Sequence, residues 1–280
     1  MSDSNTNMNS NSDTNTNSNI NTKSNSNAGV KIYITLLSLV TIVIVLAGIY
    51  FHVFRGVGNI FTKQKNVEKT ISLNGEVTRV DVKVDATNVR FQYGETFEVS
   101  YDVPEGSIPD VHMDGSTLKV SSKNNNYFDF FSFTHKDSIV ITLPSGTELD
   151  GIEFKADAGN VKIDDIISKS SRITTDAGNI KINNAKIDSL TFEVDAGNFT
   201  ADKCTFNDLR AEADAGNIKL YDTTIDYIDA ELDAGNIKAK SCTIKDGRCK
   251  TDTGNINLKG DIGDIETKTD VGNVSVGGED

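Results

Sequence analysis

The sequence contains few of the residues that disulfide, metal and catalytic sites require. It has three cysteines, three histidines, three prolines and no tryptophan in 280 residues. The cysteines, Cys204, Cys242 and Cys249, are odd in number and irregularly spaced, which gives neither a disulfide framework nor a zinc-ligand pattern. No Ser/His/Asp or Cys/His order and no phosphate-binding glycine loop is found in the sequence. The sequence therefore predicts a protein that is not an enzyme and has no cofactor.

Positive charge is scarce as well. The chain has 28 Lys and Arg against 41 Asp and Glu, which gives a formal net charge of −13. A nucleic-acid binder needs a basic stripe to neutralise phosphates, and anionic lipid head groups attract basic segments. We therefore expect no nucleic-acid partner and no docking on anionic lipid head groups.

Residues 1–29 almost lack apolar side chains. Of the first 28 residues, 21 are Asn, Ser or Thr. A segment of this composition cannot bury enough apolar surface to offset the entropy of ordering, so the sequence predicts a disordered low-complexity tail.

The only long hydrophobic run follows, from Ile32 to Phe54, inside a predicted transmembrane helix at residues 30–54. Its 23 residues include no Lys, Arg, Asp or Glu. A helix of that length reaches about 34 Å, enough to cross a hydrocarbon core of about 30 Å. Tyr33 and Tyr50 suit the aromatic belts of the two interfaces. The run is too long for a signal peptide and lacks a clear cleavage site, so we expect a permanent anchor in the lipid bilayer.

The orientation of this anchor is less clear. Lys23 and Lys31 precede the span, whereas four Lys and Arg residues follow it between positions 55 and 69. Counting these charges places the C-terminal side in the cytoplasm, but the rule weakens when a long domain follows. Residues 55–70 are predicted to be a linker.

The rest of the chain is organised around Asp-Ala-Gly-Asn. This motif recurs at a spacing of 19 residues, and 18 for the last copy, and it ends as Asp-Thr-Gly-Asn and Asp-Val-Gly-Asn. A fixed period in this range is typical of a solenoid. The motif aspartates, which define position 0 of each coil, are Asp157, Asp176, Asp195, Asp214, Asp233, Asp252 and Asp270.

Apolar residues within each coil follow the same offsets. Alternation by two predicts strands, and steps of three predict a change of direction, so each coil of about 19 residues holds about three strands and three corners. Stacked coils bury one continuous core, which predicts an all-β β-solenoid over residues 151–280. In the corner, Gly supplies a positive φ, Asp can accept backbone N–H bonds, and stacked Asn side chains can bond one another. In the second coil the inward positions are Ile180, Ile182, Ala185, Ile187, Leu190, Phe192 and Val194.

Residues 71–150 break the period except at Asp85-Ala-Thr-Asn88, which reads as a degenerate first coil. Because solenoid ends differ from their middles, we interpret this segment as an irregular N-terminal β cap. The three cysteines fall at inward positions: Cys204 and Cys242 at +9 and Cys249 at +16. We predict that all three are buried free thiols.

The Asp-Ala-Gly-Asn coils, the entry strand Ile139-Val-Ile-Thr-Leu-Pro-Ser-Gly146 and the single span ahead of them resemble the bacterial putative-adhesin domain family of unknown function. The likeness covers about residues 71–280. It implies a single-pass envelope protein with β-strand repeats outside the membrane and no established catalytic residues. This family tendency favours an extracytoplasmic repeat domain, against the Lys and Arg count.

The aspartate column of the corners is one candidate site. Carboxylates about 4.8 Å apart repel one another, so something should offset their charge. One interpretation is that each accepts corner N–H bonds and is neutralised by lysine. The alternative is Ca²⁺ held between successive corners, chiefly at Asp157, Asp176, Asp195, Asp214 and Asp233.

Two outward rows flank the corner and form the second candidate. They either compensate each other's charge across the corner or make a regular face that recognises a repeating envelope polymer. The row at +5 contains Lys162, Lys181, Lys219 and Lys238, and the row at +17 contains Glu193, Glu212 and Glu231.

The third candidate is an aromatic patch, which either covers the first coil's strand edge or contacts a protein partner or the bilayer. We expect a membrane-anchored envelope protein that displays a non-catalytic solenoid for adhesion, binding or structural support. One alternative is an envelope-stress signalling component or scaffold; a remote one is a carbohydrate-active β-helix enzyme, which would need two carboxylates about 5–10 Å apart. The patch consists of Tyr127, Phe128, Phe130, Phe131 and Phe133.

Overall fold

The computed structural model describes residues 66–122 and 138–278, which belong to one compact unit. The predicted tail, the predicted span Ile32–Phe54, most of the predicted linker and the aromatic patch lie outside these residues. Within the described ranges, no helix is both long and apolar enough to cross a membrane. The anchor therefore stays a prediction from the sequence.

The described residues are almost entirely β-structure, with one short 3₁₀ turn at Glu105–Ser107. The N-terminal strands are β1 (Asn66–Ser72), β2 (Arg79–Ala86), β3 (Asn88–Gly94), β4 (Glu98–Pro104), β5 (Asp110–Asp114), β6 (Thr117–Ser122) and β7 (Ser138–Pro144). The strands of the repeats are β8 (Glu148–Leu149), β9 (Gly151–Ala158), β10 (Val161–Asp164), β11 (Ile167–Ala177), β12 (Ile180–Asn183), β13 (Lys186–Asp202), β14 (Thr205–Tyr221), β15 (Thr224–Thr253), β16 (Ile256–Val271) and β17 (Val274–Val276).

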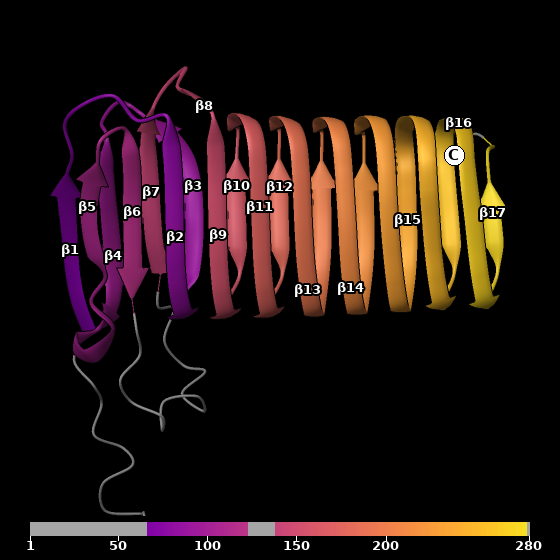
Figure 1. Ribbon diagram of the computed structural model, residues 1–280, viewed down its shortest axis with the longest axis horizontal. Helices are drawn as coiled ribbons and strands as arrows, with labels where there is room; N and C mark the ends of the chain where they lie inside the picture. The colour runs from indigo at the N-terminus through magenta and orange to yellow at the C-terminus, as the bar shows by residue number, and fades with distance from the viewer. Residues whose placement is uncertain (1–65, 123–137, 279–280) are drawn as a thin grey trace, which may run out of the picture. The chain divides into compact units, whose positions relative to one another are not determined.

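Successive coils stack in parallel register, as predicted (Figure 1). Positions 19 residues apart face each other: Phe199 pairs with Ile218, which pairs with Ile237. Figure 1 shows the later strands following one another along the stack in chain order, each coil lying against the next. The β-solenoid prediction is confirmed for the described part of the chain.

The predicted inward positions form the core. All seven inward residues of the second coil are buried, and in the fourth coil even the polar Thr223 at +9 is only 1% exposed. Thr223 donates its hydroxyl to the carbonyl of Tyr221 at 2.7 Å, which satisfies the buried group. The period of the sequence therefore fixes which side chains face inward.

A second corner, at +8, uses left-handed residues that the sequence analysis does not single out. Asp165, Asn184, Lys203, Asp222 and Ser241 have φ values between 48° and 63°. Asn and Asp tolerate this conformation better than other non-glycine residues. The missing residue of the 18-residue spacing lies at this corner, because the register with β16 shifts between Ala239 and Cys242.

The N-terminal cap is interleaved rather than sequential. Strands β2 and β3 form a coil held between β9 and β10 on one side and β6 and β7 on the other, all in parallel pairing. Strands β1, β4 and β5 pair antiparallel and form the N-terminal end of the stack: β4 pairs with β7, β1 with β4, and β5 with β6. Strand β1 begins at Asn66, inside the range predicted as linker, because it completes this cap.

The three cysteines are free and buried, as predicted. Burial raises the pKa of the Cys249 thiol to about 12 and also raises the pKa of Cys204. A thiol that stays protonated is a poor nucleophile and a poor metal ligand. The cysteines therefore serve as small core side chains.

Candidate functional site

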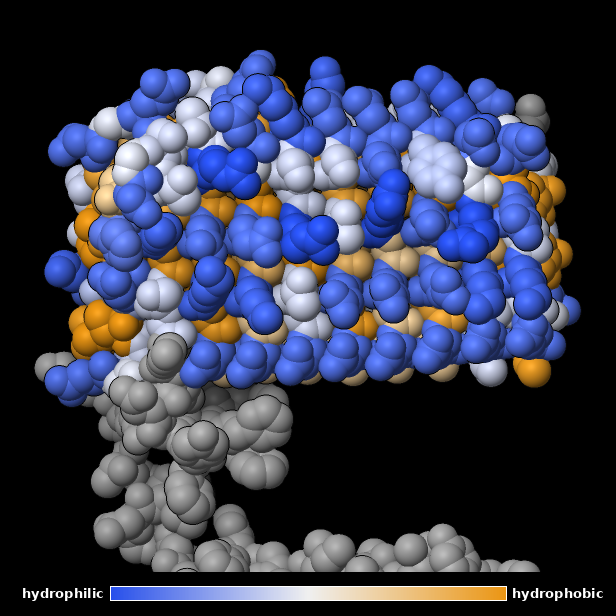
Figure 2. Space-filling model, viewed as in Figure 1, coloured by the Kyte–Doolittle hydropathy of each residue, from blue (hydrophilic) through white to orange (hydrophobic). Residues whose placement is uncertain are grey.

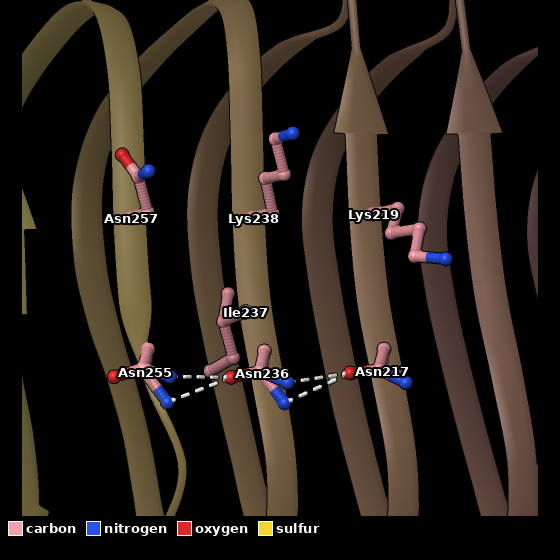
Figure 3. Close-up of a pocket in the computed structure, with 7 residues that line it drawn as sticks. All are labelled: Asn217, Lys219, Asn236, Ile237, Lys238, Asn255 and Asn257. Atoms are coloured by element: carbon pink, nitrogen blue, oxygen red, sulfur yellow. Dashed lines mark hydrogen bonds between the residues drawn. The ribbon is translucent and has the colours of Figure 1, made fainter. Parts of the chain in front are cut away.

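The asparagines of the corners form one continuous ladder. The side-chain amide of Asn179 donates to the Asn160 oxygen at 2.9 Å, and the Asn179 backbone N–H donates to the same oxygen at 3.0 Å. The contact repeats along the stack, and Figure 3 shows it at Asn217, Asn236 and Asn255. The ladder consists of Asn88, Asn160, Asn179, Asn198, Asn217, Asn236, Asn255 and Asn273.

The glycine before each asparagine is required for two reasons: its backbone has a positive φ at most corners, and it lies too close to the neighbouring coil for a side chain to fit. Gly216 has a φ of 156°, and a Cβ built on it would lie 1.6 Å from the carbonyl oxygen of Gly197 in the preceding coil. Gly235 repeats the arrangement against Gly216, at 1.5 Å. The backbones of adjacent coils therefore approach closely at this corner, and only hydrogen fits between them.

Of the two interpretations of the aspartate column, the one in which the carboxylates accept corner N–H bonds is not what the structure shows. The corner N–H groups bond elsewhere: the N–H of Gly178 donates to the carbonyl of Ala196 at 3.0 Å. Asp252 and Asp270 pair with nearby lysines at 3.4 and 3.6 Å. The other five make no hydrogen bond or ion pair with any described residue, and they are exposed. The expected carboxylate–N–H bonds are absent there because the asparagine oxygens take that role.

Metal binding at this column stays a prediction. In residues 66–122 and 138–278, no group of three His, Cys, Asp or Glu side chains lies close enough to hold a metal ion. The aspartates stand in a single file along the stack rather than converging on one point. Any calcium would need ligands beyond these carboxylates.

The lysine and glutamate rows lie on different faces, separated by the Asn ladder and the aspartate column. Lys219 faces Lys238 in the next coil on one side, and Glu212 faces Glu231 on the other. Ion pairs form within each face: Lys162 pairs with Asp164 at 2.8 Å, and Glu231 pairs with Lys250 at 2.7 Å. No ion pair between described residues joins the two rows, so the expected compensation across the corner is not found.

We call the outward positions +3, +5 and +7 the Asn/Lys face. Figure 3 looks onto this face, and Figure 2 shows the opposite side of the stack, where hydrophilic side chains also form rows that run from coil to coil. The +7 row, which the sequence analysis overlooked, continues the positive charge of the lysine row toward the C-terminal coils. Cations on this face are Arg90, Lys162, Lys181, Lys219, Lys238, Lys240 and Lys259, and its acids are Asp164 and Asp202.

The face on the other side of the corner has the opposite charge. Its acidic residues outnumber its basic ones about two to one, whereas on the Asn/Lys face the cations outnumber the acids. The acids at +15, +17 and 0 are Asp81, Asp85, Glu153, Asp157, Asp176, Glu193, Asp195, Glu212, Asp214, Asp229, Glu231, Asp233, Asp252, Glu266 and Asp270. The bases there are Lys83, Lys155, Arg172, Arg210, Arg248, Lys250 and Lys268.

At the N-terminal end of the Asn/Lys face, Asp164 neutralises its neighbours. Its carboxylate accepts bonds from Arg90 at 2.8 and 2.9 Å, from Lys162 at 2.8 Å and from Asn183 at 2.7 Å. Burial alone would raise the pKa of Asp164, but the bonds from Lys162, Asn183 and Arg90 outweigh it and lower that pKa. Asp164 is therefore ionised and offsets part of the positive charge at this end of the face.

Farther along, the face carries a groove of about 310 Å³ between the Asn ladder and the lysine row (Figure 3). Lys219 and Lys238 stand along it, and neither makes a hydrogen bond or ion pair with any described residue. The groove crosses three consecutive coils and is lined by Asn217, Lys219, Asn236, Ile237, Lys238, Asn255 and Asn257.

Comparison with known proteins identifies the fold. Three solved structures described as putative adhesins are similar to this chain, and at 19% identity or less they show the fold alone. That from Bacteroides fragilis is 19% identical, with 76% of this chain and 97% of that chain covered and a TM-score of 0.55. That from Parabacteroides distasonis is 14% identical (77% and 97% covered, TM-score 0.52), and that from Parabacteroides merdae is 16% identical (77% and 96% covered, TM-score 0.51).

No curated protein is significantly similar to this chain. A family model, however, matches residues 77–277, which include the interleaved cap and nearly all of the repeats. This is well over half of the chain. The chain therefore belongs to the Toastrack DUF4097 family.

Proposed function

We propose that this chain is a membrane-anchored envelope protein whose solenoid is a rigid, non-catalytic binding module. The observation that carries the proposal is the strict register of the outward rows, held by the unbroken Asn ladder. Such a surface offers the ladder amides at every strand spacing, about 4.8 Å, with charged rows on either side. It therefore suits adhesion or another binding role better than a reaction at a single point.

Two further observations support this proposal. The separation of charge between the two faces gives the solenoid one distinctive surface, and polar groups in an ordered row favour recognition of a partner. Structural neighbours described as putative adhesins are consistent with surface binding. Anchoring rests on the predicted span Ile32–Phe54, and the extracytoplasmic side rests on the family resemblance.

Protease accessibility on intact cells tests this function. The full chain would carry one epitope tag before Met1 and another after Asp280, and external protease would be added before and after the membrane is opened. We expect the C-terminal tag to be lost from intact cells and the N-terminal tag to be lost only after opening. Loss of the N-terminal tag alone would reverse the orientation, and recovery of the chain in the soluble fraction would refute the anchor.

A further inference from the structure

The C-terminal half of the Asn/Lys face includes two lysines whose charge no described residue neutralises. Lys219 and Lys238 have no ionic partner among the described residues, and Lys259 continues the positive charge into the next coil. No acidic residue lies at +3, +5 or +7 from Asn217 to Lys259. In a chain with a net charge of −13, this segment is a local region of positive potential, which attracts anions.

The same row provides an internal comparison. At its N-terminal end, Arg90 and Lys162 are tied to Asp164. In the coil of Lys219 the equivalent of Asp164 is Tyr221, and in the coil of Lys238 it is Lys240. Two cations at one end are thus tied to a carboxylate, whereas Lys219 and Lys238, at the end where the groove lies, have no ionic partner among the described residues.

The ladder supplies further donors beside these lysines. Each asparagine amide has two N–H groups. One hydrogen of the Asn236 amide bonds the Asn217 oxygen at 2.9 Å, and the Asn255 amide bonds Asn236 at 3.0 Å. No described residue accepts the second hydrogen of either amide.

The shape of the groove points to a linear ligand. Each of the three coils contributes a ladder asparagine, and the first two contribute Lys219 and Lys238 beside it, so amide and ammonium groups form two parallel rows along the stack (Figure 3). A small anion would contact one or two coils, whereas an extended polymer would contact all three. Strand spacing sets the repeat at about 4.8 Å.

We propose that the groove from Asn217 to Asn257 binds a linear polyanion, a polymer whose phosphate or carboxylate groups repeat along its length. The polymer runs parallel to the stack, with its anionic groups against Lys219 and Lys238 and its intervening polar atoms against the asparagine amides. This inference rests on the binding role proposed above and names the ligand class for it. Lysine suits it because ammonium groups bind phosphate and carboxylate as point charges.

The test compares two double variants of the full chain in a zwitterionic detergent. The site variant is Lys219→Gln with Lys238→Gln. The control is Lys155→Gln with Lys186→Gln, which removes the same charge from two other faces at exposed lysines without a described partner. Thermal melts of both should match the parent, because all four side chains lie outside the core. Binding of fluorescent long-chain inorganic polyphosphate and poly-L-glutamate is measured by anisotropy at several salt concentrations.

We expect the site variant to bind about 10- to 30-fold more weakly than the parent, at roughly 1 kcal/mol per lysine contact. The slope of log affinity against log salt should become shallower by about 0.7 for each lost contact. The control variant should stay within about twofold. Stronger binding of polyphosphate than of polyglutamate, or the reverse, identifies which anionic polymer the groove prefers.

Three results would overturn the inference: no binding of either polymer, equal loss in the two double variants, or monomeric phosphate binding as tightly as polyphosphate. Single-stranded DNA, itself a linear phosphate polymer, serves as a further probe: tighter binding of DNA than of both polymers would support a polyanion groove and contradict the expectation that the chain has no nucleic-acid partner. Failure here is distinguishable from failure of the proposed function. A cytoplasmic solenoid would contradict the proposed location and leave polymer binding intact, whereas a surface-exposed solenoid that ignores polyanions would do the opposite.

Discussion

Replacing Gly216 with alanine should destabilise the solenoid far more than an ordinary glycine substitution. The added Cβ would lie 1.6 Å from the Gly197 carbonyl oxygen, and real contacts of this kind do not fall below 3.0 Å. The two coils would therefore have to separate by about 1.4 Å, the difference between these distances. The 2.9 Å bond from Asn217 to Asn198 crosses the same gap and would break.

The size of the effect follows from two terms. Holding alanine near a φ of 156° costs about 1–3 kcal/mol. Losing the ladder bond and one neighbouring bond adds about 0.5–1.5 kcal/mol each. We therefore expect a loss of about 2–6 kcal/mol and a fall in melting temperature of roughly 4–24 °C for a unit of this size.

A matched control separates contact from backbone strain. Gly146 has a φ of 83°, and a Cβ there would meet nothing within 4 Å. The Gly146→Ala variant should therefore lose only about 1–2 kcal/mol, from the left-handed conformation alone. Urea and thermal unfolding followed by circular dichroism measure both variants, and hydrogen exchange shows whether the change stays in the adjacent coils. If Gly216→Ala is no less stable than Gly146→Ala, the coils do not touch at this corner.

Four further predictions concern the ladder, one carboxylate, one thiol and the aspartate column. Asn198→Ala should lower the free energy of unfolding by about 1–3 kcal/mol, because it removes bonds to both neighbours, and Asn273→Ala at the end of the ladder should cost less in the same urea titration. The pKa of Asp164 is lower in the folded chain than in the unfolded chain, so Asp164 stabilises the fold above the unfolded pKa of about 3.9, and this stabilisation is lost as the pH falls through the folded pKa. In the Asp164→Asn variant, the free energy of unfolding should therefore depend less on pH below about pH 4. An unchanged pH dependence in that range would contradict the ion cluster. Cys249, with a pKa of about 12, should resist iodoacetamide at pH 8 in the folded chain and react once urea unfolds it, as mass spectrometry would show. Millimolar Ca²⁺ should leave the melting midpoint unchanged, and a rise would indicate calcium at the corners.

The repeat made the core predictable from the sequence. Once the strict spacing was found, alternation by two assigned each side chain to the inside or the outside, and positions such as Phe192 and Cys249 are buried as expected. The Asn ladder was foreseen for the same reason, since identical residues at one period must stack. A single sequence therefore predicts the contacts between identical residues that recur at a fixed interval.

Pairings that leave no periodic trace could not be predicted. Nothing in the sequence of β2 shows that it lies between β6 and β9, because those partners are remote along the chain and their pattern is simple alternation. Asp and Asn are both common turn residues, so the sequence does not show which of the two side chains accepts the backbone N–H bonds in the corner. That depends on which side-chain oxygen faces the next coil. The Asp164 cluster was missed because Arg90 belongs to the degenerate coil, 74 residues away.

The interleaved cap has a consequence for biosynthesis. While the ribosome is still making the chain, β2 and β3 emerge early, but one flanking partner is absent until β6 and β7 have been translated and the other until β9 and β10 have followed. This closure involves long loops and should be the slow step of folding. Each later coil needs only its predecessor as a template, so the remainder can be added rung by rung as it leaves the exit tunnel.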